Sequence, residues 1–125
     1  MTEDELLIAV TSGTKQRPGL CRVLGVRYFH AYDARRSVRG FPDLVLVGRS
    51  GVAYRELKSD WENLRPEQTT WKYALLAARQ DWGIWRPRDL ASGLIRAELS
   101  ALMDMENDTP SHVNYEAKFA DSARA

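Results

Sequence analysis

The sequence predicts a small α/β domain, in which a mixed central sheet is flanked by helices and followed by a closing helix. Two apolar runs, residues 43–47 and 52–58, are separated by Gly-Arg-Ser-Gly, which is typical of two strands and a tight turn. Segments with helical spacing of apolar residues lie before and after this pair. With 125 residues, 44% of them hydrophobic, the chain can bury one core. We therefore expect one domain, residues 1–103, and an acidic tail, residues 104–125.

The expected order is helix, strand, strand, strand, helix, strand, helix, tail. The first helix should cover residues 3–14, with Thr2 as its N-cap and Gly13 as its end signal. A first strand with imperfect alternation should follow at residues 22–31.

In the second half, Pro66 suits the first position of a helix over residues 66–79. Ile84 and Trp85 should form a short last strand, and the closing helix should begin at Asp89. From about Asp104 the apolar spacing fades, so we expect a mobile or partner-bound tail.

The central hairpin brings three charged residues together if its loop has the expected length. With residues 48–51 as the loop, Val47 pairs with Val52 and Asp43 lies opposite Glu56. Side chains alternate along a strand, so Lys58 shares the face of Glu56 and Asp43. Opposed Cβ atoms lie roughly 4.5–5.5 Å apart. A two-residue loop keeps this face, whereas a three-residue loop would break the cluster.

Two carboxylates and one ammonium at one spot have two interpretations. One is a cross-strand salt bridge of Lys58 at a sheet edge. The apolar residues around the cluster instead indicate strands covered on both faces, where unbalanced negative charge is costly unless a cation binds. Asp43, Glu56 and Lys58 therefore outline a metal-dependent phosphodiesterase site.

The ordered set of short strings resembles the VRR-NUC branch of the PD-(D/E)xK nuclease superfamily, which includes small phage-type nucleases similar to Holliday junction resolvases. The resemblance runs from about Glu3 to Asp89 and implies a restriction-endonuclease-like αβββαβ core. The strings are His-x-x-Asp-x-Arg-Arg-Ser (30–37), Gly-Phe-Pro-Asp (40–43), Glu-x-Lys (56–58), Pro-Glu-Gln-x-x-Trp (66–71) and Trp-Arg-Pro-x-Asp (85–89).

The resemblance also implies a cofactor and roles for the site residues. Mg²⁺, with Mn²⁺ as a substitute, would be held by Asp43, Glu56 and the Leu57 carbonyl. The metal would polarise the scissile phosphate and lower the pKa of the attacking water. Lys58 would orient that water or stabilise developing negative charge. The family adds Gln68 and an acidic residue on the first helix.

Glu3 is the better candidate for this helix acid. It lies one turn before Leu6 and Leu7 on the apolar stripe, whereas Glu5 projects from a different face. The alternative is a solvated glutamate favoured by the helix dipole.

Gln68 lies three and seven residues before Trp71 and Leu75, on the apolar face of its helix. A glutamine there needs a partner. One possibility is a hydrogen bond to a neighbouring backbone group. The other, which we favour, is a contact with the site itself: the 56–58 strand, a metal-bound water or a phosphate.

The net charge of +1 does not indicate a partner, but the distribution of charged residues along the chain does. Residues 11–40 contain seven Lys and Arg side chains against one acid, Asp33, and lead directly into the predicted site. Arg35, Arg36, Arg39 and, from the resemblance, His30 are the candidates for DNA contact. The alternative is a solvated basic loop.

The expected function is Mg²⁺-dependent, structure-selective cleavage of DNA, with branched DNA such as a four-way Holliday junction as the leading substrate. The sequence has no helix-turn-helix pattern or zinc-finger spacing, which favours recognition of shape and backbone. Symmetric junction cutting would need a homodimer, to which Trp61, Trp82 and Tyr28 could contribute. The alternatives are a flap or nicking nuclease and a non-catalytic DNA-binding module.

The remaining sequence features concern the cellular environment. A single cysteine, Cys21, rules out an internal disulfide, and no apolar run approaches the roughly 18 residues of a membrane span. We expect a soluble, cytoplasmic protein that does not bind membranes.

Overall fold

A computed structural model describes residues 1–31 and 38–104 of the chain. The predicted acidic tail therefore lies, from residue 105 onward, outside the described residues. So do Arg35 and Arg36, two of the predicted DNA contacts.

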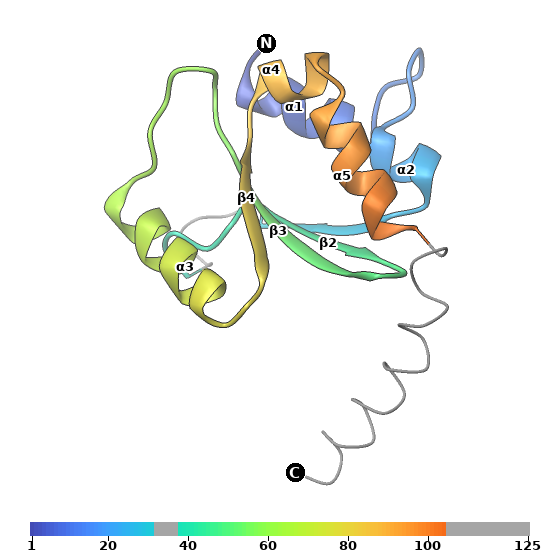
Figure 1. The fold of residues 1–125 in the computed structure, drawn as a ribbon. Coiled ribbons are helices and arrows are strands. Elements are labelled where there is room, and N and C mark those ends of the chain that lie inside the picture. Colours follow the sequence, from blue (N-terminus) through green and yellow to red (C-terminus); the bar gives the residue numbers. More distant parts are fainter. Residues whose placement is uncertain (32–37, 105–125) are drawn as a thin grey trace, which may run out of the picture.

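The described residues form a mixed α/β fold around a four-stranded sheet, as predicted (Figure 1). The strands are in the order β1-β2-β3-β4, with β1, β2 and β3 antiparallel and β4 parallel to β3. The strands are β1 (Arg27–His30), β2 (Leu44–Gly48), β3 (Gly51–Leu57) and β4 (Asp81–Trp85).

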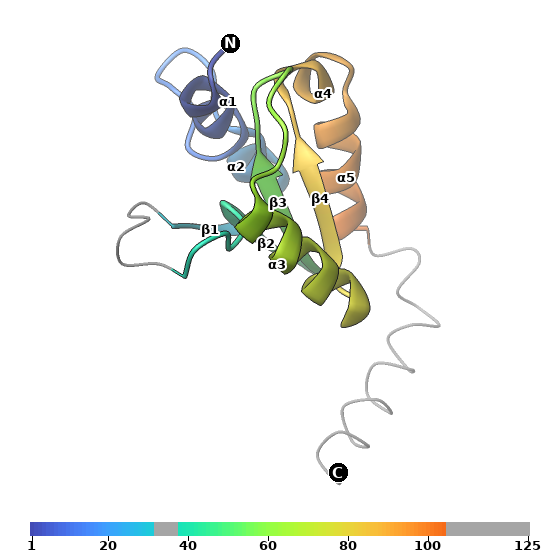
Figure 2. The same cartoon turned by 90° about the vertical axis from the view of Figure 1, so that its left-hand side faces the viewer.

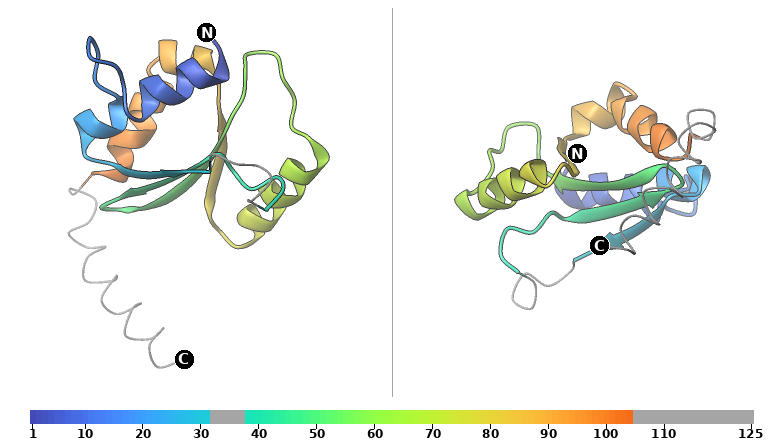
Figure 3. Two further views of the ribbon diagram at one scale, coloured as in Figure 1. Left: turned by 180° about the vertical axis from the view of Figure 1, so that it is seen from behind. Right: turned by 60° about the horizontal axis from the view of Figure 1, so that its bottom comes forward.

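Helices cover the sheet unequally on its two faces. Four of them lie on one face, while α3 lies on the other, beside β4 (Figures 1 and 2). The view from below in Figure 3 separates the two layers in the same way. The helices are α1 (Glu3–Val10), α2 (Leu20–Leu24), α3 (Pro66–Ala77), α4 (Pro87–Ala91) and α5 (Leu94–Leu102). None of those in the described ranges is both long and apolar enough to cross a bilayer.

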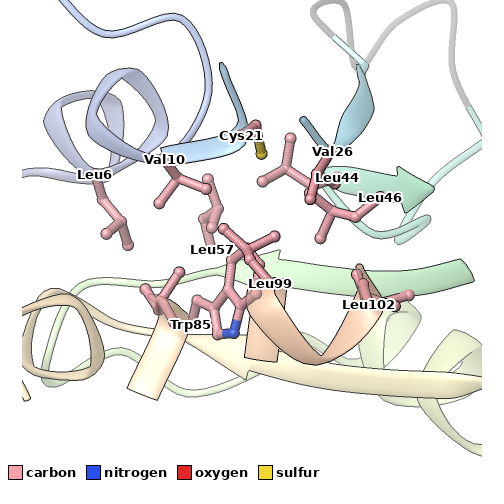
Figure 4. Packing of buried hydrophobic residues seen from close by; sticks show 12 residues of the cluster. Leu6, Val10, Cys21, Val26, Leu44, Leu46, Leu57, Trp85, Leu99 and Leu102 are labelled. Carbon is pink, nitrogen blue, oxygen red and sulfur yellow. The ribbon is translucent and has the colours of Figure 1, made fainter. Parts of the chain in front are cut away.

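The hydrophobic core lies between the sheet and the four-helix layer (Figure 4). Trp85 of β4 is its largest fully buried side chain. The other members labelled in the figure come from α1, α2, the following Val26, the strands and α5: Leu6, Val10, Cys21, Val26, Leu44, Leu46, Leu57, Leu99 and Leu102. This packing holds one face of β2 and β3 in place and leaves the other face to form a site with α3.

The prediction of a strand over residues 22–31 is wrong in its first half. Residues Leu20–Leu24 form α2, and Gly25 ends this helix in the left-handed conformation, with φ at 79°. The Val26 N–H donates to the Cys21 carbonyl at 2.9 Å, as expected for such an end. Only Arg27–His30 remain extended. Gly25 after an apolar residue was the sequence signal for this helix end.

The first helix is shorter than predicted, although its N-cap is confirmed. The Thr2 Oγ1 accepts from the Glu5 N–H at 3.1 Å, and the Glu5 carboxylate accepts from the Thr2 N–H at 2.9 Å, a capping box. The helix ends at Val10, not at residue 14, because the chain folds back on itself. A Cβ on Gly19 would lie 1.9 Å from the Thr11 carbonyl oxygen, so only glycine permits this approach.

The last predicted elements also differ in their bounds. The closing helix consists of two pieces, α4 and α5, separated by Gly93 with φ at 87°. The helix predicted to reach residue 79 ends at Ala77, because Arg79 has a positive φ of 61°. The last strand is longer than predicted, since the pairing with β3 already begins at Asp81.

Candidate active site

The predicted register of the central hairpin is confirmed. Val47 pairs with Val52, and the pairing extends from Gly48 opposite Gly51 to Leu44 opposite Arg55. The hairpin loop therefore consists of the two residues between Gly48 and Gly51. The turn is tied to the end of α5, where the Ser50 N–H donates to the Leu102 carbonyl at 2.8 Å. This contact locks the register and with it the side-chain faces.

Asp43 and Glu56 therefore meet just beyond the last paired residues of β2 and β3. The Asp43 Oδ2 accepts a hydrogen bond from the Leu57 N–H at 2.8 Å, which holds its carboxylate against β3. A hydrogen bond between the Asp43 and Glu56 carboxyl groups joins the two side chains.

Gln68 links α3 to this pair. Its Nε2 donates to the Glu56 Oε1 at 3.0 Å, and its Oε1 accepts from the Arg65 N–H at 2.8 Å. Both partners considered for Gln68 therefore occur, the neighbouring backbone and the Glu56 side chain. Because both ends of the amide are engaged, Gln68 orients the Glu56 carboxyl group.

The chain before Asp43 is fastened to the same helix. A Cβ on Gly40, whose φ is 81°, would lie 2.4 Å from the Glu67 backbone, so the chain passes directly against the first turn of α3. The rings of Phe41 and Trp71 meet edge to face, with centroids 5.0 Å apart, and the Trp71 Nε1 donates to the Arg39 carbonyl at 3.1 Å. These contacts position Asp43 opposite Gln68.

A cavity of about 700 Å³ opens over the carboxylate pair. Seven predicted site residues line it: Glu3, Arg39, Asp43, Glu56, Leu57, Lys58 and Gln68. Of those within the described ranges, only His30 is not in its lining. The structure thus brings together residues from α1, the 38–43 segment, β3 and α3.

The buried charges of the cavity are unbalanced. Glu56 is only 2% exposed and Lys58 3%. Burial, followed by the hydrogen bond and the charge of Asp43, raises the pKa of Glu56 to about 10, although Lys58 acts in the opposite direction. Glu56 is therefore expected to keep its proton at neutral pH when no cation is bound, as an acid buried against a second acid does.

Glu3 faces the cavity, but its nearest partner is another acid, Glu62. Burial and a hydrogen bond with Glu62 raise the pKa of Glu3. Hydrogen bonds with Ser59 and then with Glu3 lower the pKa of Glu62. The hydrogen bond of Glu3 is thus with Glu62 and not with Asp43 or Glu56.

The donor set at Asp43 and Glu56 fits a hard divalent cation. Two carboxylates lie side by side beneath an open cavity, with the Leu57 backbone beside them. Glu3 does not complete a third position in this arrangement. In residues 1–31 and 38–104, no group of three or more His, Cys, Asp or Glu side chains is placed to hold a metal.

The predicted DNA contacts have different environments. Arg39 lines the cavity, and its side chain is 85% exposed, with Glu67 3.9 Å away. His30 lies near Asp43 and Asp4, whose charges raise its pKa, but burial outweighs them and lowers it.

Three further charged residues line the cavity that were not predicted as site residues: Glu62, Arg65 and Glu67. Pro66 at the helix start was a signal that Arg65, as the N-cap, would lie beside Gln68. Glu62 lies in an aperiodic loop, and no sequence pattern pointed to it.

Comparisons with known proteins add no relative. No family model matches the chain, and neither a curated protein nor a solved structure matches it significantly.

Proposed function

We propose that this protein hydrolyses phosphodiester bonds in DNA and requires Mg²⁺, with Mn²⁺ as a substitute. The observation that carries the proposal is the Asp43–Glu56 carboxyl pair, with Asp43 half-buried against the buried Glu56 and Lys58, under a cavity open to solvent. Buried like charges are costly, and the most direct way to balance them here is a divalent cation.

Each residue of the cluster has a role in this proposal. Asp43, Glu56 and the Leu57 carbonyl would hold the metal, which when bound lowers the pKa of a water and polarises the phosphate. Lys58, fixed by burial, places a positive charge where negative charge develops. Gln68 keeps the Glu56 carboxyl group in one orientation through its 3.0 Å hydrogen bond.

The arrangement of elements supports the resemblance to the PD-(D/E)xK nucleases. A helix, three antiparallel strands, a helix and a parallel fourth strand follow in the order expected of a restriction-endonuclease-like core, with the short α2 as an addition. The Glu-x-Lys string, residues 56–58, lies at the end of β3, and its residues line the cavity.

We propose branched DNA as the substrate, with a four-way junction first among the candidates. Arg39 and Arg65 on the cavity lining offer positive charge to phosphates, which recognises the backbone rather than the sequence. Symmetric cutting of a junction requires two such sites, so this substrate implies a homodimer.

The test is a panel of four-way, flap, splayed-arm and linear DNA of matched sequence, incubated with Mg²⁺, Mn²⁺ or EDTA. We expect metal-dependent cleavage, strongest on a branched substrate. Glu56→Gln removes the charge without changing the shape and should be inactive. Glu5→Gln is the matched control, because the Glu5 carboxylate contacts Thr2 away from the cavity. Equal cleavage by wild type and Glu56→Gln would contradict the proposal.

A second candidate function is a DNA-binding module that does not cleave. Glu3 is hydrogen-bonded to Glu62, and the described residues hold no three-ligand group, which favours weak metal binding. For a nuclease, Mg²⁺ should raise the melting temperature of the wild type and raise that of Asp43→Asn less. Tight DNA binding with neither metal stabilisation nor cleavage would identify the binding module.

A further inference from the structure

Trp61 is the most exposed large hydrophobic side chain among the described residues, at 89%. It lies in the loop between β3 and α3, which rises beside the start of α4 (Figures 1 and 2). Burying an indole ring contributes substantially to stability, so folding alone does not account for leaving one in solvent.

The loop is held in place although its tip is exposed. The Arg86 Nη1 donates to the Ser59 carbonyl at 2.6 Å and to the Glu62 carbonyl at 2.8 Å. The backbone on both sides of Asp60 and Trp61 is therefore fastened to the residue before α4. The Asp60 Oδ1 accepts from the Arg88 N–H at 3.1 Å. The ring of Trp61 is therefore presented from an anchored turn.

The turn stands at the rim of the candidate active site. Glu62, the next residue, lines the cavity and is hydrogen-bonded to Glu3 on its other side. Lys58, three residues before Trp61, and Arg65, four residues after it, also line the cavity. Trp61 itself is not in the cavity lining, so its ring can meet only a nucleotide that extends from the cavity past this turn.

The immediate surroundings favour a single flat ring as the partner of Trp61. Its neighbours at the tip are polar: Asp60, Glu62 and Asn63. Protein–protein anchor residues usually lie in well-packed, desolvated pockets, and this exposed turn offers no such pocket around Trp61. A nucleobase needs only the face of the indole, and stacking tolerates any base.

We propose that Trp61 stacks on an unpaired base beside the scissile phosphate and thereby selects DNA with unpaired nucleotides at a branch. This inference rests on the proposed nuclease function and adds a specificity-determining residue to it. In a closed duplex each base is already stacked on both sides, so the ring has no free face to meet.

The test measures binding in EDTA, where DNA is not cleaved, by fluorescence anisotropy. The ligands are a flap with unpaired thymines at the branch, the same flap with abasic sites in their place, and a fully paired duplex. Trp61→Ala should weaken flap binding about tenfold, in the range of one lost stacking contact, and leave duplex binding unchanged. Tyr73→Ala is the control, because Tyr73 is 63% exposed on α3 and does not line the cavity.

The abasic flap makes the test specific to stacking. It should bind wild type about tenfold more weakly than the intact flap, yet Trp61→Ala should not distinguish the two flaps. Trp61→Phe, which keeps an aromatic face, should recover part of the lost affinity. An equal loss on flap and duplex, or no loss on the flap, would overturn the inference.

Two further outcomes separate this inference from the proposed function. If wild type cleaves branched DNA and Trp61→Ala binds and cleaves equally well, only the role of Trp61 is wrong. If wild type neither binds nor cleaves any of these substrates, the proposed function fails and this inference fails with it. If Trp61→Ala instead converts a dimer to a monomer in sedimentation, the ring contacts a second copy, and the stacking role is wrong.

Discussion

Two neighbouring residues of β3, Arg55 and Glu56, are both buried but belong to charge clusters on opposite faces of the sheet. Arg55 points toward α5, where its Nε and Nη2 donate to the Glu98 Oε1 at 3.1 and 3.0 Å. Its Nη2 also pairs with the Asp81 Oδ1 at 2.9 Å, and its guanidinium lies over the Trp85 ring, 5.4 Å from the centroid. This cluster, one cation with two acids, pairs both of its carboxylates directly with Arg55 and leaves them partly in contact with solvent.

The cluster on the other face differs from it. Glu56 is hydrogen-bonded to a neutral amide and to a second acid, and its pKa is raised to about 10. The Arg55 cluster has no cavity comparable in volume over it, since the hollow beside it is about 330 Å³ against about 700 Å³ over Glu56. The comparison shows that burial of charge alone does not mark a site. An acid that is buried against a second acid, under an open cavity, does.

The largest expected effect is on catalysis by Glu56. Glu56→Gln should lower the cleavage rate at least about a thousandfold, or about 4 kcal/mol, because a neutral amide is a poor ligand for a hard cation. Single-turnover cleavage with saturating Mg²⁺ measures it. Retention of more than a tenth of the wild-type rate would refute the assignment.

Arg55→Met should instead reduce stability. It leaves the Glu98 carboxylate without its cation, and breaking a buried pair costs about 3–5 kcal/mol. We expect about 3 kcal/mol, the lower end, because the side chains of Glu98 and Asp81 are 32% and 55% exposed. Urea unfolding measures the loss. A variant as stable as wild type would show that the cluster is not structural.

Gln68→Ala tests how the Glu56 carboxyl group is oriented. Partners that orient metal ligands typically change metal affinity by about 10–100-fold. We expect the Mg²⁺ concentration for half-maximal cleavage to rise about tenfold, with little change in the rate at saturation. Thr70→Ala, on the same helix outside the cavity lining, is the control. A lower saturating rate at unchanged Mg²⁺ dependence would give Gln68 a different role.

The raised pKa of Glu56 predicts a pH dependence of stability in EDTA. Folding raises this pKa from 4.5 to about 10, so the folded state holds a proton that the unfolded state releases within that window. The contribution of Glu56 to stability is therefore full below about pH 4.5 and declines as the pH rises toward 10. Between pH 6 and pH 9 the melting temperature of wild type should therefore fall steadily relative to that of Glu56→Gln. Parallel curves for the two proteins would contradict the shift.

The smallest expected effect is that of Glu3. Because its carboxyl group is hydrogen-bonded to Glu62, Glu3→Gln should change the cleavage rate by less than about threefold, the equivalent of under 1 kcal/mol. Glu5→Gln, compared in the same assay, should have no effect. A loss of a hundredfold or more for Glu3→Gln would instead make Glu3 a metal ligand.

Local periodicity carried the prediction of the Asp43, Glu56 and Lys58 cluster. Side chains alternate along a strand, and the Gly-Arg-Ser-Gly turn limits the register, so three residues sufficed to define one face. Helical spacing likewise placed Gln68 toward the sheet. Both inferences depend on geometry that is repeated every two or about four residues, which the sequence alone determines.

The tertiary structure decided the rest, because it depends on contacts between segments far apart in the chain. Glu3 and Glu62 meet only because the β3–α3 loop passes beside α1, and Arg86 anchors that loop from the start of α4. The helical form of residues 20–24 depended on the αL conformation of Gly25, which a strand-like apolar run concealed. Long-range contacts have no period in the sequence, so side-chain packing, not local propensity, determined which acids share the cavity and which ring stands at its rim.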